Sequence, residues 1–280
     1  MASADRIRLV RDKASGVEAI HARFAGHAYD LHRHDDWLVG TTESGIQDFS
    51  CRGSRRRSTP GRVILIEPQE AHDGAAGDTG GFAYHMLYLP RRWLRLKLGQ
   101  HADDTFGFSR TLADDTRLTG AIRQACTALA GQADALTRDA SLDAVLAALR
   151  RHLQLEPRRS PPAIDKPAVR RARDWLHERL EDNIGADELA RIAGAADRFH
   201  LARSFRAAYG SAPHAYRVQL RLIRARTLLA RGDAPADVAA NCGFADQSHF
   251  GRWFRKAYGL TPAAYRAACT DVPDHRALRC

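Results

Sequence analysis

Three histidines in the first third of the chain are the residues best suited to chemistry. His32 and His34 form an HxH pair in GHAYDLHRHDDW, and His72 closes the segment PQEAH. Three imidazoles can hold a divalent cation and leave coordination positions open for another ligand. We treat the three as weak metal candidates, and we expect neither a bound metal nor another cofactor.

The rest of the sequence lacks the spacings that catalysis usually needs. There is no G-x-S-x-G, no phosphate-binding G-K-[ST] and no H-E-x-x-H. No two cysteines form a C-x-x-C pair, so neither a zinc knuckle nor a redox dithiol is indicated. The five cysteines, an odd number, are scattered along the chain: Cys51, Cys126, Cys242, Cys269 and Cys280. They suit a reducing cytosol, and we expect a chain without enzymatic activity.

Charge is unevenly distributed over the 280 residues. The formal net charge is +10. Residues 168–270 carry 17 Arg and Lys against 10 Asp and Glu, whereas the remaining residues carry 26 against 23. The last third is therefore the part expected to meet a polyanion. The N-terminus has no apolar signal region and no run is long enough for a membrane span, so we expect a cytoplasmic protein.

The C-terminal third carries the same phrase twice. Residues 189–217 align with residues 238–266 without a gap, and 15 of the 29 positions are identical. Matching glycines, aspartates, aromatic residues and arginines recur, far more often than chance allows. The sequence therefore contains two copies of one structural unit in tandem.

Each copy is predicted to be a helix-turn-helix. In the second copy, Gly243 would end a short helix over residues 236–242, because glycine adopts the left-handed conformation at little cost. Asp246 would then cap a second helix. One face of that helix is apolar and the other is polar and basic, with Arg206 and Arg255 repeated in the two copies. Such a helix fits the DNA major groove, where arginine and glutamine recognise base edges.

The segment between the copies, residues 214–232, is predicted to be one helix with an apolar stripe. Four arginines are distributed around that stripe: Arg217, Arg221, Arg224 and Arg226. A helix of about 17 residues spans roughly 25 Å. The two second helices can then reach successive turns of the major groove, about 34 Å apart.

The N-terminal part is predicted to be a small antiparallel barrel or sandwich followed by helices. Short apolar or alternating runs predict strands at residues 17–24, 36–42, 46–51, 61–67 and 82–89. The arginine run at residues 52–57 is predicted to be a solvated loop, and the alternative is that it binds an anionic effector or the other domain. Two amphipathic helices within residues 110–154 would pack on their own barrel or pair with a second subunit. Four prolines in residues 156–167 mark a linker.

These features resemble the AraC/XylS family of bacterial transcription regulators. The resemblance rests on the tandem motif, on QLRLIRARTLL and on GFADQSHFGRWFRKAYGLTPAAYR, within residues 168–268. The pattern G-x5-HxH at residues 26–34 is similar to a cupin barrel, although Leu38 and Val39 stand where metal-binding cupins usually add a glutamate. The fold class implied is α+β with two domains: an N-terminal cupin-like β-barrel with accessory helices, and a C-terminal all-α tandem helix-turn-helix domain.

The resemblance also implies boundaries and site residues. Residues 1–155 would bind an effector and dimerise, 156–167 would link, and 168–270 would bind DNA through motifs at about 186–210 and 235–259. The expected DNA-contacting residues are Arg198, Phe199, Ala202, Arg203, Arg206, Gln247, Ser248, His249, Arg252 and Arg255. The expected effector pocket is lined by His32, His34, Trp37, His72 and Tyr84, if these side chains face inward.

The function implied is an effector-responsive, sequence-specific regulator that activates transcription by contacting RNA polymerase. Its partners would be double-stranded promoter DNA, a small-molecule effector, RNA polymerase and a second copy of the chain. One alternative is a metal-dependent cupin enzyme tethered to a DNA-binding domain. Another is a DNA-repair regulator with a reactive cysteine, for which Cys51 and Cys126 are the candidates.

Overall fold

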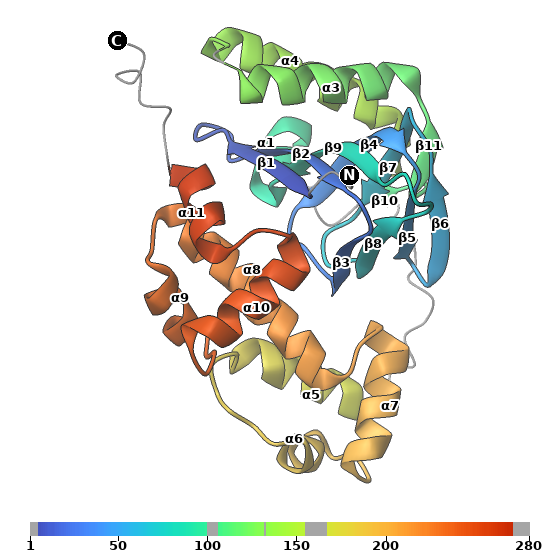
Figure 1. Ribbon diagram of the computed structural model, residues 1–280. Coiled ribbons are helices and arrows are strands. Elements are labelled where there is room, and N and C mark those ends of the chain that lie inside the picture. Colours follow the sequence, from blue (N-terminus) through green and yellow to red (C-terminus); the bar gives the residue numbers. More distant parts are fainter. Residues whose placement is uncertain (1–4, 100–105, 132, 155–166, 271–280) are drawn as a thin grey trace. The chain divides into compact units, whose positions relative to one another are not determined.

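The computed structural model describes residues 5–99, 106–131, 133–154 and 167–270 (Figure 1). The chain divides into two compact units, residues 1–158 and 159–280. Of the expected linker, only Pro167 is among the described residues, and it begins a helix. Within the described part, no helix is both long enough and apolar enough to cross a membrane.

The first unit is built on antiparallel strands. One sheet has the order β1-β2-β9-β4-β7-β11, a second has the order β3-β8-β5-β6, and β10 pairs with β12. Their bounds are β1 Arg6–Arg11, β2 Glu18–Phe24, β3 His27–His32, β4 Trp37–Gly45, β5 Gln47–Cys51, β6 Ser54–Ser58, β7 Arg62–Ile66, β8 His72–Ala76, β9 Phe82–Leu89, β10 Gly107–Phe108, β11 Leu112–Asp114 and β12 Leu153–Gln154. Side chains from both large sheets line one cavity, so the sheets face each other as the walls of the expected barrel.

Both faces of the larger sheet are covered. Successive side chains of a strand point to opposite faces. In β9, Tyr84 and Met86 line the barrel cavity, whereas Leu87 and Leu89 belong to the core on the other face. Strands that are buried on both faces read as nearly continuous apolar runs, which is why the sequence predicted β2, β4, β7 and β9.

The arginine run expected in a loop is strand β6, which pairs with β5. The hairpin turns at Arg52 and Gly53, whose φ values are 55° and 68°. Two successive positive φ values match the twist of a two-residue hairpin. Ion pairs to Glu67 and Glu70 hold the half-buried Arg52 side chain in place. Pairing with β5, rather than an apolar pattern, therefore makes this segment a strand.

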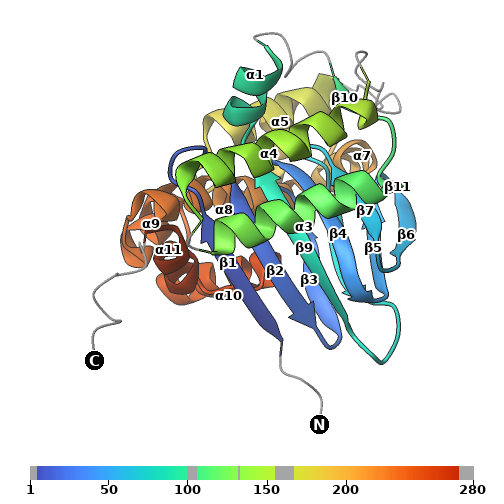
Figure 2. The same ribbon diagram turned by 90° about the horizontal axis from the view of Figure 1, so that it is seen from above.

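Helices cover the outer face of the larger sheet (Figure 2). Asp115 and Asp134 cap two of them by accepting hydrogen bonds from backbone N–H groups at 2.9 and 2.7 Å. The helical elements of this unit are α1 Arg91–Leu98, α3 Thr116–Ala130, α4 Ala135–Leu149 and the short 3-10 helix η1 Arg150–His152. Apolar stripes of α3 and α4 pack with Val39, Leu65 and Leu87 in one core.

The second unit consists of helices over its described residues. They are α5 Pro167–Glu178, α6 Ala186–Ala193, α7 Arg198–Tyr209, α8 Pro213–Arg231, α9 Pro235–Asn241, α10 Gln247–Tyr258 and α11 Pro262–Thr270. Phe205 is fully buried in the core shared by α5–α8. Phe254 is its counterpart at the same place in the second copy, where it contacts the rings of Phe250, Tyr258 and Tyr265.

Candidate functional site

The turns of the two sequence copies have the same backbone conformation. Gly194 ends α6 with φ 66°, and Gly243 follows α9 with φ 72°. In each turn, the glycine N–H donates to the carbonyl three residues back, and the next N–H donates to the carbonyl five residues before it. This is the Schellman arrangement, which satisfies carbonyls at a helix end. The repeated glycines are thus required by conformation.

The second helix of each copy starts and stops in the same way. Asp197 accepts a hydrogen bond from the backbone N–H of His200 at 2.7 Å, and Asp246 from that of His249 at 2.6 Å. Both helices end at a glycine in the left-handed conformation. A short helix, a tight turn and a capped second helix make a helix-turn-helix in both copies.

The second helices α7 and α10 bury one face and expose the other. Leu201, Phe205, Phe250 and Phe254 are buried in the core. Of the ten expected DNA-contacting residues, eight are exposed: Arg198, Phe199, Arg203, Arg206, Gln247, Ser248, Arg252 and Arg255. Ala202 and His249 are half-buried. Phe199 is 62% exposed, which is unusual for so large an apolar side chain.

Two of these side chains are already engaged within the protein. Arg198 forms an ion pair with Asp187 at 3.0 Å, and its guanidinium lies over the Phe199 ring. The Nε2 of His249 accepts a hydrogen bond from the indole N–H of Trp253 at 2.9 Å. Any contact from Arg198 or His249 to a base would therefore replace or share these interactions.

The sequence missed the role of the arginines on α8. Arg217, Arg221 and Arg226 are buried, and only Arg224 is exposed among the four expected around the stripe. Arg221 donates to the carbonyls of residues 180 and 181 at 2.9 and 3.1 Å, and Arg217 donates to that of Asp182 at 3.0 Å. Arg217 and Arg221 thus satisfy the carbonyls that follow α5. Their spacing of four residues, which places both on one face of the helix, was the signal for this role in the sequence.

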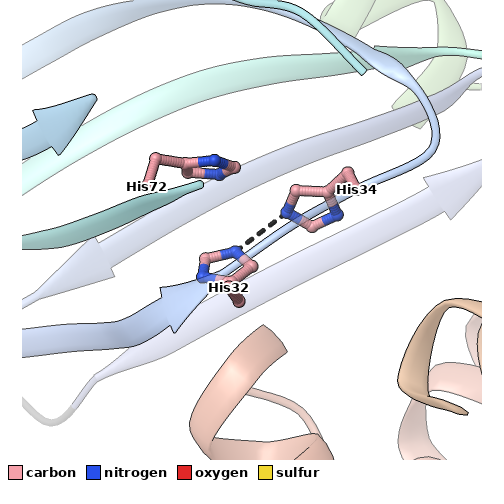
Figure 3. Close-up of side chains that lie close together, drawn as sticks. All are labelled: His32, His34 and His72. Atoms are coloured by element: carbon pink, nitrogen blue, oxygen red, sulfur yellow. Dashed lines mark hydrogen bonds between the residues drawn. The ribbon is translucent and has the colours of Figure 1, made fainter. Parts of the chain in front are cut away.

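The barrel brings together the three histidines (Figure 3). His32 ends β3 and pairs across the sheet with His72 at the start of β8, while His34 follows two residues later. All three are buried: His32 is 4% exposed, His34 1% and His72 6%. The Nε2 atoms of His32 and His34 are 2.9 Å apart.

The hydrogen bonds of the outer nitrogens fix the tautomers of two rings. The Nδ1 of His32 lies 2.7 Å from the carbonyl of Asp30, and that of His72 lies 2.9 Å from the carbonyl of Glu70. A carbonyl only accepts, so each Nδ1 carries the proton and each Nε2 presents a lone pair. Burial lowers the pKa of His72 to about 4, which keeps it neutral. The lone pairs of His32 and His72 fit a divalent cation, with outer partners of the kind that orient metal-binding histidines. The Nε2 of His34 donates to that of His32, so it would give up this proton to join them.

The cavity beside His32 and His72 is small. Its volume is about 20 Å³, and its walls are Tyr29, His32, Leu38, Gln47, Phe49, Ile64, Ile66, His72, Asp73, Tyr84, Met86 and Tyr88. A single water needs roughly 10–15 Å³ on this measure. An organic molecule would enter only if these side chains moved, including the hydrogen-bonded hydroxyls of Tyr29 and Tyr84.

Trp37 does not belong to this pocket, contrary to the expectation from sequence. Its ring stacks on Phe106 at 4.8 Å and lies edge-on to Phe108 at 5.0 Å, in the core with the helices. The next residue, Leu38, lines the cavity instead. The alternation of β4 decides this: Trp37 falls on the outer face of the sheet, and Tyr84 of β9 falls on the inner face.

The structure also bears on the reactive-cysteine alternative. Cys51 and Cys126 are buried, and burial raises the pKa of each thiol to about 12. The nucleophile is the thiolate, which forms readily only where the pKa is lowered. Neither cysteine is therefore activated for transfer chemistry.

Acid is expected to destabilise the first unit through His72. Its pKa is about 4 in the folded chain against an ordinary 6.5, so the unfolded chain binds more protons between these values. The contribution of His72 to the free energy of unfolding is therefore fully present above pH 6.5 and is lost as the pH drops toward 4, by about 3 kcal/mol. Urea unfolding across this range, with chelator present, should show a slope that His72→Gln flattens. An equal slope in the two proteins would contradict this.

Two known protein families match this chain, and each match falls within one of the two units. Residues 15–149 match the AraC-like ligand binding domain family, and residues 189–268 match a helix-turn-helix domain family. The HTH-type transcriptional regulator YbfI of Bacillus subtilis, itself uncharacterized, is 24% identical over 225 residues, which cover 80% of this chain and 82% of YbfI.

Solved structures of ToxT from Vibrio cholerae share the fold. One, at 1.65 Å resolution, has a TM-score of 0.53 with 10% identity, covering 91% of this chain and 99% of ToxT. Another, with bound unsaturated fatty acid, has a TM-score of 0.50 with 13% identity and covers 96% of each chain. A ligand-binding barrel, two helix-turn-helix motifs and these matches agree: the chain belongs to the AraC family of DNA-binding transcription regulators, a family that is not enzymatic.

Proposed function

We propose that this chain is an effector-responsive activator that binds promoter DNA through both helix-turn-helix motifs. The observation that carries the proposal is the repeated scaffold with unlike exposed residues. The caps and turns of α7 and α10 are the same, whereas Arg198 and Phe199 stand where Gln247 and Ser248 stand in the second copy. Shared positions support folding, and differing exposed positions would read different bases.

The proposed base contacts are Arg198, Phe199, Ala202 and Arg203 from α7, and Gln247, Ser248, His249 and Arg252 from α10, with Arg206 and Arg255 toward the backbone. Arginine binds guanine and glutamine binds adenine through paired hydrogen bonds in the major groove. The exposed Phe199 would contact a thymine methyl. The 19 residues of α8, roughly 28 Å long, would space the two helices along the duplex.

Replacing Arg252 tests the interface. Arg252→Ala should weaken promoter binding by about 1–3 kcal/mol and relax the preference at one base position. The matched control is Arg191→Ala, which removes the same charge from α6, where the exposed arginine pairs only loosely with Glu188 at 4.0 Å. The measurement is footprinting and competition binding at several salt concentrations.

The two possible failures are distinct. Equal weakening on all sequences would reassign Arg252 to a phosphate contact. A complete lack of protection by the wild-type chain at every salt concentration would overturn the proposed function.

We further propose that the effector binds between the two sheets of the barrel, beside His32, His34, His72 and Tyr84. Binding would shift an equilibrium between two states of the regulator, which requires unequal affinity for them. Because the cavity is only about 20 Å³, this site would open when an organic effector binds. A thermal-shift screen of the full chain against metabolites tests this, since a ligand of the folded state raises its stability by mass action.

The proposed partners in activation are RNA polymerase and a second copy of the chain. Helices α3 and α4 are the expected dimer contact, and Leu136 at the start of α4 is 80% exposed, which supports an apolar contact there. Sedimentation of the full chain and of Leu136→Glu measures this, and a monomer at every concentration would contradict it. A promoter-reporter assay in which the chain lowers transcription would contradict activation.

A further inference from the structure

A second cluster of metal-binding side chains lies on the outer face of the larger sheet, away from the barrel cavity. His21 of β2 is the direct cross-strand partner of His85 in β9, and β9 in turn pairs with β4, which carries Glu43. The register between β4 and β9 shifts between Thr42 and Ser44, so Glu43 occupies a bulge. Bulges redirect side chains, often at functional sites.

The three side chains converge on one point. The rings of His21 and His85 are stacked, with centroids 4.5 Å apart and planes 15° apart. Both present Nε2 to the same carboxylate: His21 at 2.7 Å from Oε2 and His85 at 3.6 Å from Oε1 of Glu43. One ligand atom from each residue lies within 4.8 Å of the others. Ligands around an ion bound at roughly 2.0–2.2 Å lie about 3–3.5 Å apart. Because each nitrogen lone pair lies in the plane of its ring, the two stacked rings would tilt toward each other to share one ion.

The surroundings of the cluster favour a cation. A hollow of about 410 Å³ adjoins it, and the C-terminal turn of α3, with Cys126, Thr127 and Ala130, forms one wall. The carbonyl end of a helix attracts positive charge. Arg8 also lines the hollow, but its guanidinium donates to the carbonyl of Ala130 at 2.9 Å.

The protonation states suit ligation as well. The hydrogen bond from His21 lowers the pKa of Glu43. Burial, and after it the charge of His21, lower the pKa of His85, although Glu43 acts in the opposite direction. At neutral pH the carboxylate is therefore charged and the His85 ring is neutral. These are the forms that bind metals.

We propose that His21, Glu43 and His85 bind a divalent first-row transition metal ion on the outer face of the sheet. Two imidazoles and one carboxylate on one side of the ion would leave the remaining coordination positions to water. Such a ligand set suits zinc, iron or nickel. The ion would tie β2, β9 and β4 together beside the end of α3. This proposal does not depend on DNA binding or on the effector.

Zinc binding to the full chain tests the site, using competition against a chromophoric chelator. The barrel histidines are a second possible ligand set, so the reference protein is His72→Gln. In that background, Glu43→Gln and His21→Ala should each weaken zinc binding by more than about tenfold. Loss of a residue that only orients a metal ligand already weakens binding by about tenfold or more, and the loss of a ligand should cost at least as much. The His21 side chain is 48% exposed, so its removal leaves the core intact.

The control is His177→Gln, which removes an exposed histidine of the other unit and should leave zinc binding unchanged. Cobalt absorbance provides a second readout, since ligand-field bands should vanish with Glu43→Gln. The proposal is overturned if the His72→Gln protein binds no zinc, or if Glu43→Gln and His21→Ala bind zinc as tightly as their parent.

Discussion

Gly243→Ala is expected to destabilise the second unit by about 3–5 kcal/mol. The backbone at this position has φ 72°, a left-handed conformation that costs an L-residue about 1–2 kcal/mol. An added Cβ would also lie 2.9 Å from the carbonyl oxygen of Glu181 and 2.7 Å from Nη2 of Arg221. Backbone cannot retreat as a side chain does, and moving Arg221 breaks its own hydrogen bonds.

Two other glycines provide matched controls for this substitution. Gly194 has the same conformation in the first turn, but its Cβ would meet only the end of the exposed Arg171 side chain, so about 1–2 kcal/mol is expected. Gly251 lies inside α10 with open space around it, so Gly251→Ala should stabilise by about 0.5–1 kcal/mol. Urea unfolding of the full chain, with hydrogen exchange of α9 and α10 to assign the transition, measures all three. Equal losses at Gly243 and Gly194 would contradict the steric argument.

Arg221→Ala is expected to cost about 3–4 kcal/mol. The side chain is 7% exposed and donates to the carbonyls of Leu180 and Glu181 at 2.9 and 3.1 Å. Hydrogen bonds from a charged donor contribute about 1.5–3 kcal/mol, and both carbonyls would lose this partner. The cavity left by the long side chain adds to the loss.

The control for this prediction lies one turn further along the same helix. Arg224 forms an ion pair with Glu181 at 2.6 Å, but the two side chains are 44% and 56% exposed. An exposed pair contributes about 0–1 kcal/mol, because water and salt screen it. Arg224→Ala should therefore be nearly neutral in the same unfolding measurement. A loss equal to that of Arg221→Ala would show that charge, and not burial with hydrogen bonding, decides the role of α8.

Much of the second unit follows from sequence because its determinants are local. Gly194 and Gly243 end helices by conformational preference, and Asp197 and Asp246 cap the next helices by hydrogen bonds within three residues. A repeat at fixed spacing makes each of these signals appear twice. The exposed faces of α7 and α10 follow from helical periodicity alone.

The barrel was predictable in class and less so in detail. Strands β2, β4, β7 and β9 carry apolar runs, because both faces of their sheet are covered. Strands β3, β6 and β8 carry mostly polar or small residues, and pairing with neighbouring strands gives them their structure. No local pattern reports such pairing.

The sequence by itself determined the family, the two copies of the helix-turn-helix and the presence of the HxH histidines. Tertiary structure alone decided that His32, His34 and His72 converge, that Trp37 faces the helices, and that Arg221 is buried against carbonyls. It also brought His21, Glu43 and His85 together from three strands. The physical reason is that caps, turns and periodicity act between near neighbours, whereas the face and the partner of a side chain depend on register between distant segments.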